Sequence, residues 1–385
     1  MKISNIRIKN LAVQWEKLFG DQSKIPDYLL HPSANFSGDN PPRIGQFSTL
    51  IFIDTDEGIT GVGEAWSLPA PRIVGSIIEN MLKPLLIGKD PLAIEQIWQK
   101  MYGSMQNSYL RGTLLEAMSG IDIALWDIKG KYLGLPIFRL LGGPIRQKIE
   151  TYASPVPFMP PLEAAEKALE FKKKGFKTIK VKIGSGFKID LERIKAVRDA
   201  VGTEIGIVTD ANCGLTIPDA INLGLRLREY EVKWLEEPVS VEDRAGLAEV
   251  RRVVNIAVVA GENEHTVFGI LELLHLRAID AIQVNITRCG GITGARKISE
   301  VAEAFKIPMA PHGVGSAIGI VATLHLLSSI PNFLIYEYNQ LLNPLRDDLL
   351  TKPLFFKDGS LYVPENPGLG IELNEEVISK FDMEK

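Results

Sequence analysis

Three acidic residues recur at one spacing in the second half of the chain. Asp210, Glu236 and Glu262 each follow a short apolar run, and 26 residues separate each acid from the next. Carboxylates that converge on one point repel one another unless a cation lies among them. Their oxygens suit a hard divalent ion, so the pattern predicts a Mg²⁺ site, with Mn²⁺ as the second choice. Unrelated surface acids are the alternative, but equal spacing in three successive units argues against it.

Two lysines come shortly before these acids. Lys180 and Lys182 flank Val181, so a strand would place both side chains on the same face. A neighbouring positive charge makes a lysine amine harder to protonate. We therefore predict that Lys182 is a general base and that the charge of Lys180 is what keeps Lys182 from being protonated. A lysine pair is more often a solvated strand face, but its place one strand before the acids favours a catalytic role.

The elements that must position these residues alternate as strand and helix. The expected strands are residues 149–153, 178–183, 205–210, 232–236, 257–261, 281–285, 308–311 and 333–337. Eight parallel strands joined by helical crossovers close into a barrel, in which reacting groups project from the C-terminal strand ends. An open doubly wound sheet is the rival fold, but no glycine-rich phosphate motif follows the first strand of the series.

Other polar residues fall at or near the same strand ends. His312 follows the seventh strand, which faces the second across the barrel, so His312 and Lys182 would flank a bound substrate. Glu337 ends the eighth strand. The candidate contacts to the substrate are Asn212, Arg288, Tyr152 and Asn285.

The rest of the chain is expected to cap the barrel. Residues 1–141 combine a hairpin over 48–64 with helices over 73–86, 91–101 and 113–132, which predicts an α+β capping domain. The polar stretch 20–45 is long for a connector and is interpreted as a lid, with a decorative insertion as the alternative. The barrel would occupy residues 142–338, and residues 339–385 would return to the capping domain.

The amino-acid composition limits the classes of partner that the protein is expected to bind. The chain has 43 Lys and Arg against 47 Asp and Glu, a balance that does not favour nucleic acid. Two cysteines cannot form a disulfide framework, which indicates a reducing cytoplasm. The N-terminus lacks the features of a signal peptide, and the longest apolar stretch, 317–330, is too short to cross a bilayer. We therefore expect a cytoplasmic protein with a small-molecule partner and no membrane segment.

Six motifs follow one another along the second half of the chain: KVK (180–182), TDAN (209–212), WLEEP (234–238), GEN (261–263), RCGGIT (288–293) and PHGVGSAIG (311–319). Taken together, these motifs resemble the enolase superfamily, mandelate racemase subgroup. The resemblance covers nearly the whole chain and includes residues 119–143, which are similar to a capping-domain helix of that family.

The resemblance implies a (β/α)7β barrel under a capping domain, and homo-oligomers are frequent in such proteins. It also implies Mg²⁺ held by the three acids, Lys182 and His312 on opposite faces of the substrate, and Glu337 near the substrate carboxylate. Mg²⁺ would stabilise the enediolate that forms when a proton is removed α to a carboxylate.

One position departs from the family pattern. The family pairs its histidine with an aspartate at the end of strand six, where this chain has Asn285. An amide can orient an imidazole but cannot stabilise an imidazolium as a carboxylate does. Proton abstraction then falls to Lys182, and His312 assists departure of a β-hydroxyl group.

The predicted function is therefore Mg²⁺-dependent dehydration of a sugar acid, an aldonate or an aldarate, to a 2-keto-3-deoxy acid. A racemase or epimerase that shares the first step is the main alternative. Two other classes remain open at this point: an enzyme that forms a Schiff base through Lys180 or Lys182 without a metal, and a relative that binds a sugar acid without catalysis.

Overall fold

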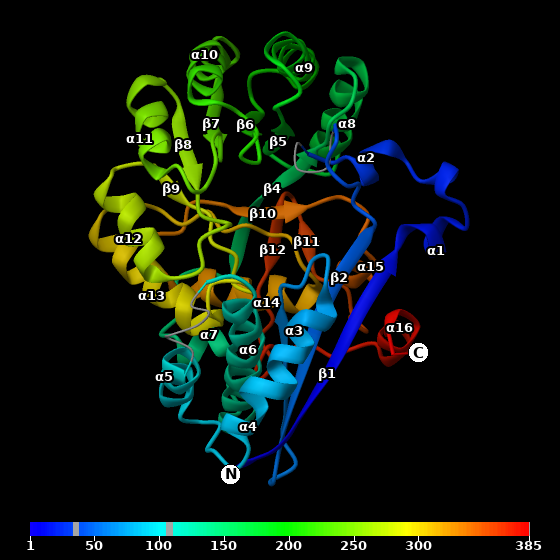
Figure 1. Cartoon of the computed structure of the whole chain (residues 1–385), viewed down its shortest axis with the longest axis vertical. Coiled ribbons are helices and arrows are strands. Elements are labelled where there is room, and N and C mark those ends of the chain that lie inside the picture. Colours follow the sequence, from blue (N-terminus) through cyan, green and yellow to red (C-terminus); the bar gives the residue numbers. More distant parts are fainter. Residues whose placement is uncertain (34–37, 105–110, 385) are drawn as a thin grey trace.

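A computed structural model describes residues 1–33, 38–104 and 111–384. Two sheets organise these residues, a three-stranded antiparallel sheet near the N-terminus and a larger sheet that curves into a barrel (Figure 1). No helix within the described ranges combines the length and the apolar character needed to cross a membrane.

The antiparallel sheet contains β1 (Ile3–Gln14), β2 (Gly45–Thr55) and β3 (Thr60–Ala65). Helix α6 (Thr113–Leu133) lies against it, and Gly61 and Gly63 of β3 make this approach possible, since a Cβ atom on either would collide with a carbonyl oxygen of α6. The remaining elements of this part are α1 (Trp15–Phe19), η1 (Gln22–Lys24), α2 (Asp27–Leu30), α3 (Pro71–Ile77), η3 (Ile78–Leu82), α4 (Lys83–Leu86) and α5 (Ile94–Ser104).

The barrel strands pair in parallel in sequence order. They are β4 (Lys148–Val156), β5 (Thr178–Lys182), β6 (Gly206–Asp210), β7 (Val232–Glu236), β8 (Ala257–Ala260), β9 (Ala281–Ile282) and β10 (Tyr336–Asn339). Bridges from Ile282 to Met309 and from Met309 to Phe333, together with the pairing of β10 with β4, close the circle. The predicted closed barrel is thus confirmed.

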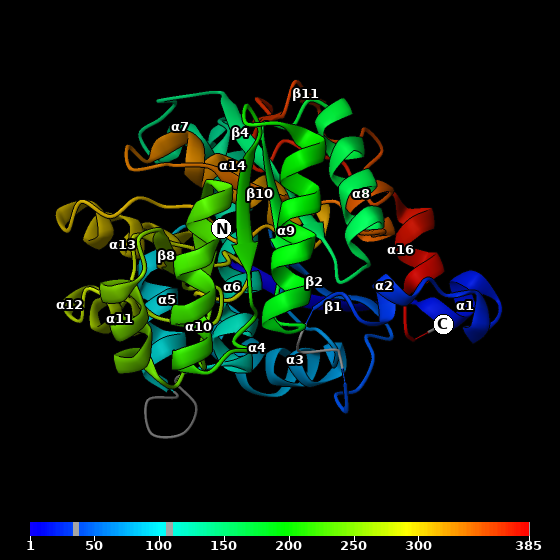
Figure 2. The same ribbon diagram turned by 90° about the horizontal axis from the view of Figure 1, so that it is seen from above.

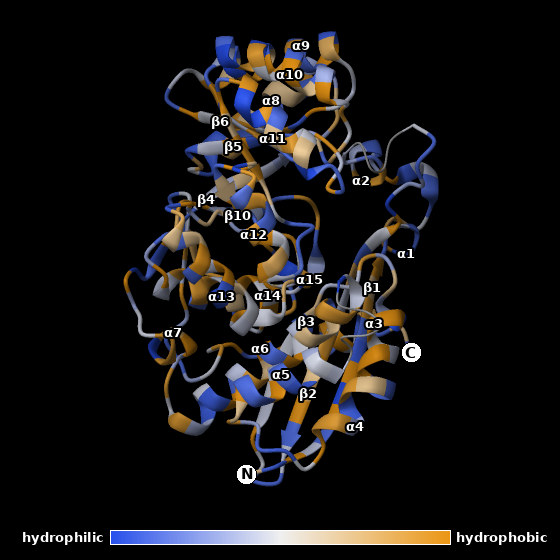
Figure 3. Ribbon diagram, turned by 60° about the vertical axis from the view of Figure 1, so that its left-hand side comes forward, coloured by the Kyte–Doolittle hydropathy of each residue, from blue (hydrophilic) through white to orange (hydrophobic). Residues whose placement is uncertain are grey.

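Helices surround the barrel and keep one face on it. They are α8 (Pro161–Lys173), α9 (Phe187–Val201), α10 (Ile217–Leu227), η4 (Arg228–Tyr230), α11 (Arg244–Val253), α12 (Val267–His275), α13 (Gly291–Ala304) and α14 (Ala317–Ser329). The short helix α7 (Ile137–Leu140) precedes the first strand and contacts α6 and α14. Figure 2 shows α8, α9 and α10 standing side by side outside the strands. Hydrophilic and hydrophobic stretches alternate along α9, α10 and α11 (Figure 3), as expected for helices with one face in water.

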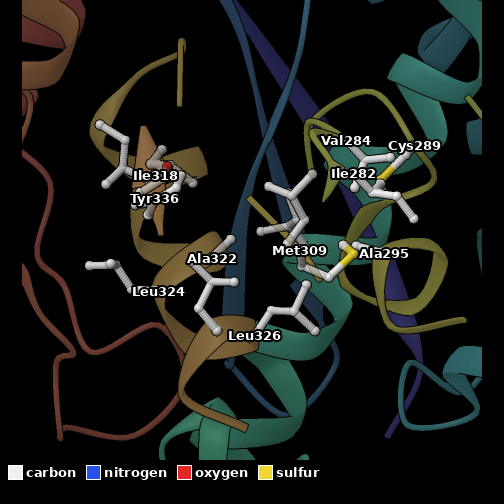
Figure 4. Packing of buried hydrophobic residues seen from close by; sticks show 14 of the residues in the cluster. Ile282, Val284, Cys289, Ala295, Met309, Ile318, Ala322, Leu324, Leu326 and Tyr336 are labelled. Carbon is white, nitrogen blue, oxygen red and sulfur yellow. The ribbon is translucent and has the colours of Figure 1, made fainter. Parts of the chain in front are cut away.

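The seventh strand is shorter than the sequence predicts. Within 308–311 only Met309 forms a bridge, because Pro308 and Pro311 have no N–H group to donate to a ladder. Side-chain packing holds this position: Met309 lies in an apolar cluster with residues of β9, α13 and α14 (Figure 4). The eighth strand is shifted by three residues at its start, to Tyr336–Asn339, so Asn339 lies on the same face as Glu337.

The C-terminal segment contacts both sheets. Its elements are α15 (Pro344–Asp347), β11 (Phe356–Lys357), β12 (Ser360–Tyr362) and α16 (Glu375–Phe381). Strand β12 pairs with β4, and the residues after α16 reach β1, where the Met383 N–H donates to the Asn10 carbonyl at 2.9 Å. The limits 1–141, 142–338 and 339–385 stay a proposal for the division into domains.

Two buried carboxylates of the N-terminal part cap helices of the barrel. Glu64, at the end of β3, accepts hydrogen bonds from the N–H groups of Ser316 and Gly319, both at 2.8 Å, where α14 begins. Asp122 of α6 accepts a hydrogen bond from the N–H group of Thr293 at 2.9 Å, in the first turn of α13. These contacts join the two sheets next to the segments that carry Arg288 and His312.

Candidate active site

A cavity of about 180 Å³ opens at the end of the barrel where the parallel strands terminate. Of the residues predicted from the sequence, those that line it are Lys180, Lys182, Asn212, Glu262, Arg288, His312 and Glu337. Three residues of the predicted lid, Pro32, Ser33 and Arg43, also line it. The rest of that lid includes residues 34–37, which lie outside the described residues.

The three spaced acids converge beneath this cavity. One oxygen from each of Asp210, Glu236 and Glu262 lies within 4.8 Å of the others. Burial and the neighbouring charge of Asp210 raise the pKa of Glu236 well above its ordinary value. A divalent cation would relieve this repulsion, and a set of three carboxylates matches the oxygen ligands that Mg²⁺ prefers. The residues present therefore fit the predicted metal.

The second oxygen of Glu236 is fixed from outside the cluster. Its Oε2 atom accepts hydrogen bonds from Gln283 Nε2 at 2.7 Å and Trp234 Nε1 at 3.3 Å. Such outer hydrogen bonds orient a carboxylate toward a metal. Neither Gln283 nor Trp234 was predicted as a site residue. The acids were found by their equal spacing in the sequence, and no such pattern marks a single amide or indole in a strand.

Lys182 lies at the edge of the cavity beside the first acid. Its Nζ atom is 2.5 Å from Asp210 Oδ2 and 2.5 Å from Asn212 Oδ1. Although burial opposes it, the ammonium groups of Lys182 and Lys180 hold the pKa of Asp210 below its usual range. Asn212 thus contacts Lys182 and also lines the cavity, where its contact with a substrate is predicted.

Lys180 has a different setting from the one predicted. Its ammonium group is buried 2.8 Å from both Glu236 Oε1 and Glu337 Oε1, and 3.2 Å from Asp210 Oδ2. Burial opposes the charge, but Glu236 and Glu337 keep the pKa of Lys180 well above its ordinary value. The prediction that the charge of Lys180 makes Lys182 harder to protonate therefore needs correction, because three carboxylates balance that charge.

His312 stands on another wall of the cavity. Its Nε2 atom lies 3.4 Å from Glu262 Oε2 and 3.8 Å from Glu337 Oε2, and its ring packs 5.8 Å from that of Trp66. Burial opposes ionisation of Glu337, but Lys180 and His312 lower the pKa of Glu337 to about 2. Glu337 also accepts hydrogen bonds from the Ser154 hydroxyl and the Gly313 N–H group. It is therefore an anchored carboxylate that links Lys180 to His312.

Asn285 lies behind His312 and outside the cavity wall. Its Oδ1 atom accepts hydrogen bonds from the N–H and hydroxyl groups of Thr287, at 2.8 and 2.7 Å. Its Nδ2 atom therefore faces His312 Nδ1, at 2.9 Å, and donates to it, which leaves the proton of a neutral ring on Nε2. The predicted substrate contact of Asn285 is replaced by this contact with the imidazole.

Of the remaining predicted contacts, one lines the cavity and one does not. The Arg288 guanidinium donates to Glu116 Oε1 at 3.1 Å and to the Glu262 carbonyl at 3.0 Å. Tyr152 is fully buried below Lys180, with the ammonium group 5.7 Å from its ring centre, and it does not reach the cavity. The prediction for Tyr152 was wrong in placing it at the mouth, because its position in β4 faces the barrel interior.

Two family descriptions match the chain. The family described as "Enolase C-terminal domain-like" matches residues 163–377. The family described as "Mandelate racemase / muconate lactonizing enzyme, N-terminal domain" matches residues 44–142.

Known proteins are similar over nearly the full chain. The D-galactarolactone cycloisomerase of Agrobacterium fabrum is 35% identical, and the match covers 87% of this chain and 91% of that protein. The arabinonate dehydratase of Saccharolobus solfataricus is 32% identical, with coverage of 86% and 89%. The crystal structure of a racemase from Streptomyces coelicolor with bound magnesium matches with a TM-score of 0.88 at 26% identity, covering 99% of this chain and 100% of that one.

Proposed function

Because the chain belongs to the mandelate racemase and muconate lactonizing enzyme group of the enolase superfamily, we propose that it dehydrates a sugar acid, an aldonate or an aldarate, to a 2-keto-3-deoxy acid. The observation that carries the proposal is the convergence of three carboxylates beside Lys182, with His312 on another wall of the same cavity. A relative named arabinonate dehydratase supports the same reaction class.

Asp210, Glu236 and Glu262 would hold Mg²⁺, and the bound ion would stabilise the negative charge that grows on the substrate carboxylate during proton removal. Lys182 in its neutral form takes the α-proton on its Nζ atom, and Asn212 orients that atom. His312 donates its Nε2 proton to the departing β-hydroxyl group, which leaves as water. The enol that remains converts to the 2-keto acid.

Asn285 favours dehydration over racemisation in this scheme. A racemase needs a base on each face of the substrate, whereas the amide of Asn285 holds His312 Nδ1 as an acceptor and directs the ring proton toward the cavity. A proton donor in that position suits a leaving hydroxyl group.

A second candidate is the opening of a sugar-acid lactone, favoured by the match to a relative named D-galactarolactone cycloisomerase at 35% identity. The same first step would remove the α-proton. A lactone ring oxygen on the β-carbon would then leave in place of a hydroxyl group. Lactones therefore belong in any substrate screen.

Incubation with a library of aldonates, aldarates and their lactones in the presence of Mg²⁺ should yield a 2-keto acid from at least one compound, measured as its semicarbazone. The Lys182→Met variant should lower kcat by about 100-fold or more, since a general base contributes at least that much. The matched control is Lys188→Met, because the Lys188 side chain is 90% exposed and does not line the cavity.

Turnover of a substrate without keto-acid formation, with solvent deuterium at the α-carbon, would show a racemase or epimerase instead. Borohydride trapping of substrate on the protein in the presence of a chelator would indicate a Schiff base. No turnover of any compound would favour a non-catalytic relative.

We also propose that the protein works in the cytoplasm as a homo-oligomer with small-molecule partners and without nucleic acid. The cytoplasmic assignment is supported by Cys213 and Cys289, which are both free thiols. Burial, together with the charge of Glu237, raises the pKa of the Cys213 thiol, so it stays protonated.

A further inference from the structure

The cavity contains an arginine that sequence analysis did not identify. Arg43 lies between α2 and β2, only 8% of the residue is exposed, and it lines the cavity together with Ser33 and Ser154. Its own N–H group donates to the Leu30 carbonyl at 2.8 Å, which ties this stretch to the end of α2. The side chain is therefore held in place at the mouth of the barrel.

All described partners of the Arg43 guanidinium are neutral. Its Nε atom donates to the Gly45 carbonyl at 3.3 Å, and its Nη2 atom donates to Gln46 Oε1 at 2.5 Å. Among the described residues, Nη1 has no hydrogen-bond acceptor and no carboxylate forms an ion pair with the group. Residues 34–37 are Ala, Asn, Phe and Ser, so that stretch has no carboxylate to offer.

The other positive groups around the cavity differ in this respect. Lys180 and Lys182 both contact Asp210, and Arg288 is paired with Glu116 at 3.1 Å. A buried guanidinium without a counter-charge is costly, because few polar groups replace the water it has lost. Arg43 is thus the single cationic side chain, among the described cavity residues, that still lacks an anion.

The position of Arg43 relative to the metal residues follows from the barrel. Gln46, which accepts from Arg43, donates from Nε2 to the Leu342 carbonyl at 3.1 Å, in the segment that follows β10. Strand β10 is the eighth of the barrel, and β7, which carries Glu236, is the fourth. Arg43 is therefore tied, through Gln46, to the segment that follows the eighth strand, across the barrel from the fourth.

We propose that Arg43 binds the second carboxylate of a dicarboxylic substrate, so that the sugar acid is an aldarate rather than an aldonate. This inference rests on the proposed function, in which the first carboxylate lies at Asp210, Glu236 and Glu262. A guanidinium presents parallel N–H groups that match a carboxylate, and the free Nη1 group supplies one of them. A terminal CH₂OH group would leave the charge unpaired.

The test uses matched pairs of substrates that differ only at C6. Galactarate, glucarate and mannarate each have a carboxylate there, whereas galactonate, gluconate and mannonate have a hydroxymethyl group. In the wild-type protein with Mg²⁺, kcat/KM should be higher for an aldarate than for its matched aldonate. The Arg43→Gln variant should lower this ratio by about 10- to 100-fold, since a hydrogen bond to a charged group is lost. The Arg72→Gln variant is the control, because Arg72 is exposed and lies outside the cavity.

Binding measured by calorimetry separates this proposal from the proposed function. If no keto acid forms from any compound, the dehydratase proposal fails, but tighter binding of galactarate than of galactonate that depends on Arg43 still supports the inference. Turnover of aldonates with an equal or lower kcat/KM for aldarates would overturn it. An equal loss for both members of a pair in Arg43→Gln would also overturn it, as would the absence of aldarate binding.

Discussion

At the scale of single residues, the orientation of one amide decides how His312 can act. Asn285 differs from aspartate by one NH₂ group, yet its Oδ1 atom is already used by Thr287, so that NH₂ group must face the imidazole. An aspartate in the same place would present an oxygen to the ring and stabilise its protonated form. In the proposed mechanism, the side chain behind His312 thus determines whether the imidazole acts as a proton donor or as a base.

We therefore predict that Asn285→Asp increases proton exchange on the face of the substrate nearest His312. The expected result is about a tenfold rise in deuterium incorporation with inversion at the α-carbon, measured by NMR in D₂O, because the imidazolium gains a charged partner. Val314 loses the hydrogen bond that Asn285 Nδ2 donates to its carbonyl at 3.0 Å, so some loss of stability accompanies the change. Adding His312→Asn to this variant should remove the gain. Exchange at the wild-type rate in Asn285→Asp would contradict the role assigned to the amide.

At the scale of elements, the sequence could predict the strands whose ends carry acids. Strands β6 and β7 are short buried runs, interrupted only by the exposed Lys233, that end in Asp210 and Glu236, so both signals lie within a few positions of one another. The length of the seventh strand was harder to predict, because Pro308 and Pro311 leave only Met309 to form a bridge. Arg43 and Trp66 reach the cavity from segments without periodicity. Only the docking of the antiparallel sheet on the barrel brings them there.

The docked surfaces enclose a buried acid, Asp122 of α6, which we expect to make the stability of the protein depend on pH. Burial raises the pKa of Asp122 to about 7, against about 4 for an exposed aspartate. Because the folded-state pKa is raised, the stabilising effect of the bound proton is present below about pH 4 and is lost as pH rises through about 7. As pH rises from about 4 to about 7, the free energy of unfolding should therefore fall by a few kcal/mol because of Asp122.

We predict that the Asp122→Asn variant removes this pH dependence. Its Oδ1 atom can still accept the hydrogen bond from Thr293 at the start of α13, but the amide has no proton to release. Urea unfolding at pH 5 and pH 7 should show that the wild type loses stability relative to the variant as pH rises. A constant difference between the two proteins at both values would show that Asp122 is ionised throughout this range.

At the scale of the whole molecule, three successive strands place their acids at one point, where the carboxylates repel one another unless a cation lies among them. Any ligand that binds only the folded protein raises its stability by mass action. We predict that Mg²⁺ raises Tm, because it relieves the repulsion between Asp210, Glu236 and Glu262, and that a chelator reverses the change. At a Mg²⁺ concentration of 100 times Kd the gain should be about 2.7 kcal/mol.

The Glu236→Gln variant tests whether this gain arises at the proposed site. The variant removes one charge and one ligand, so Mg²⁺ should bind it at least about tenfold more weakly and shift its Tm less at equal concentration. The metal-free variant should be as stable as the metal-free wild type or more so, since the amide repels Asp210 less than a carboxylate does. Glu242→Gln, an exposed residue after the same strand, is the matched control. An equal Mg²⁺ response in wild type and Glu236→Gln would place the ion elsewhere, and calorimetric titration of both proteins would settle its stoichiometry.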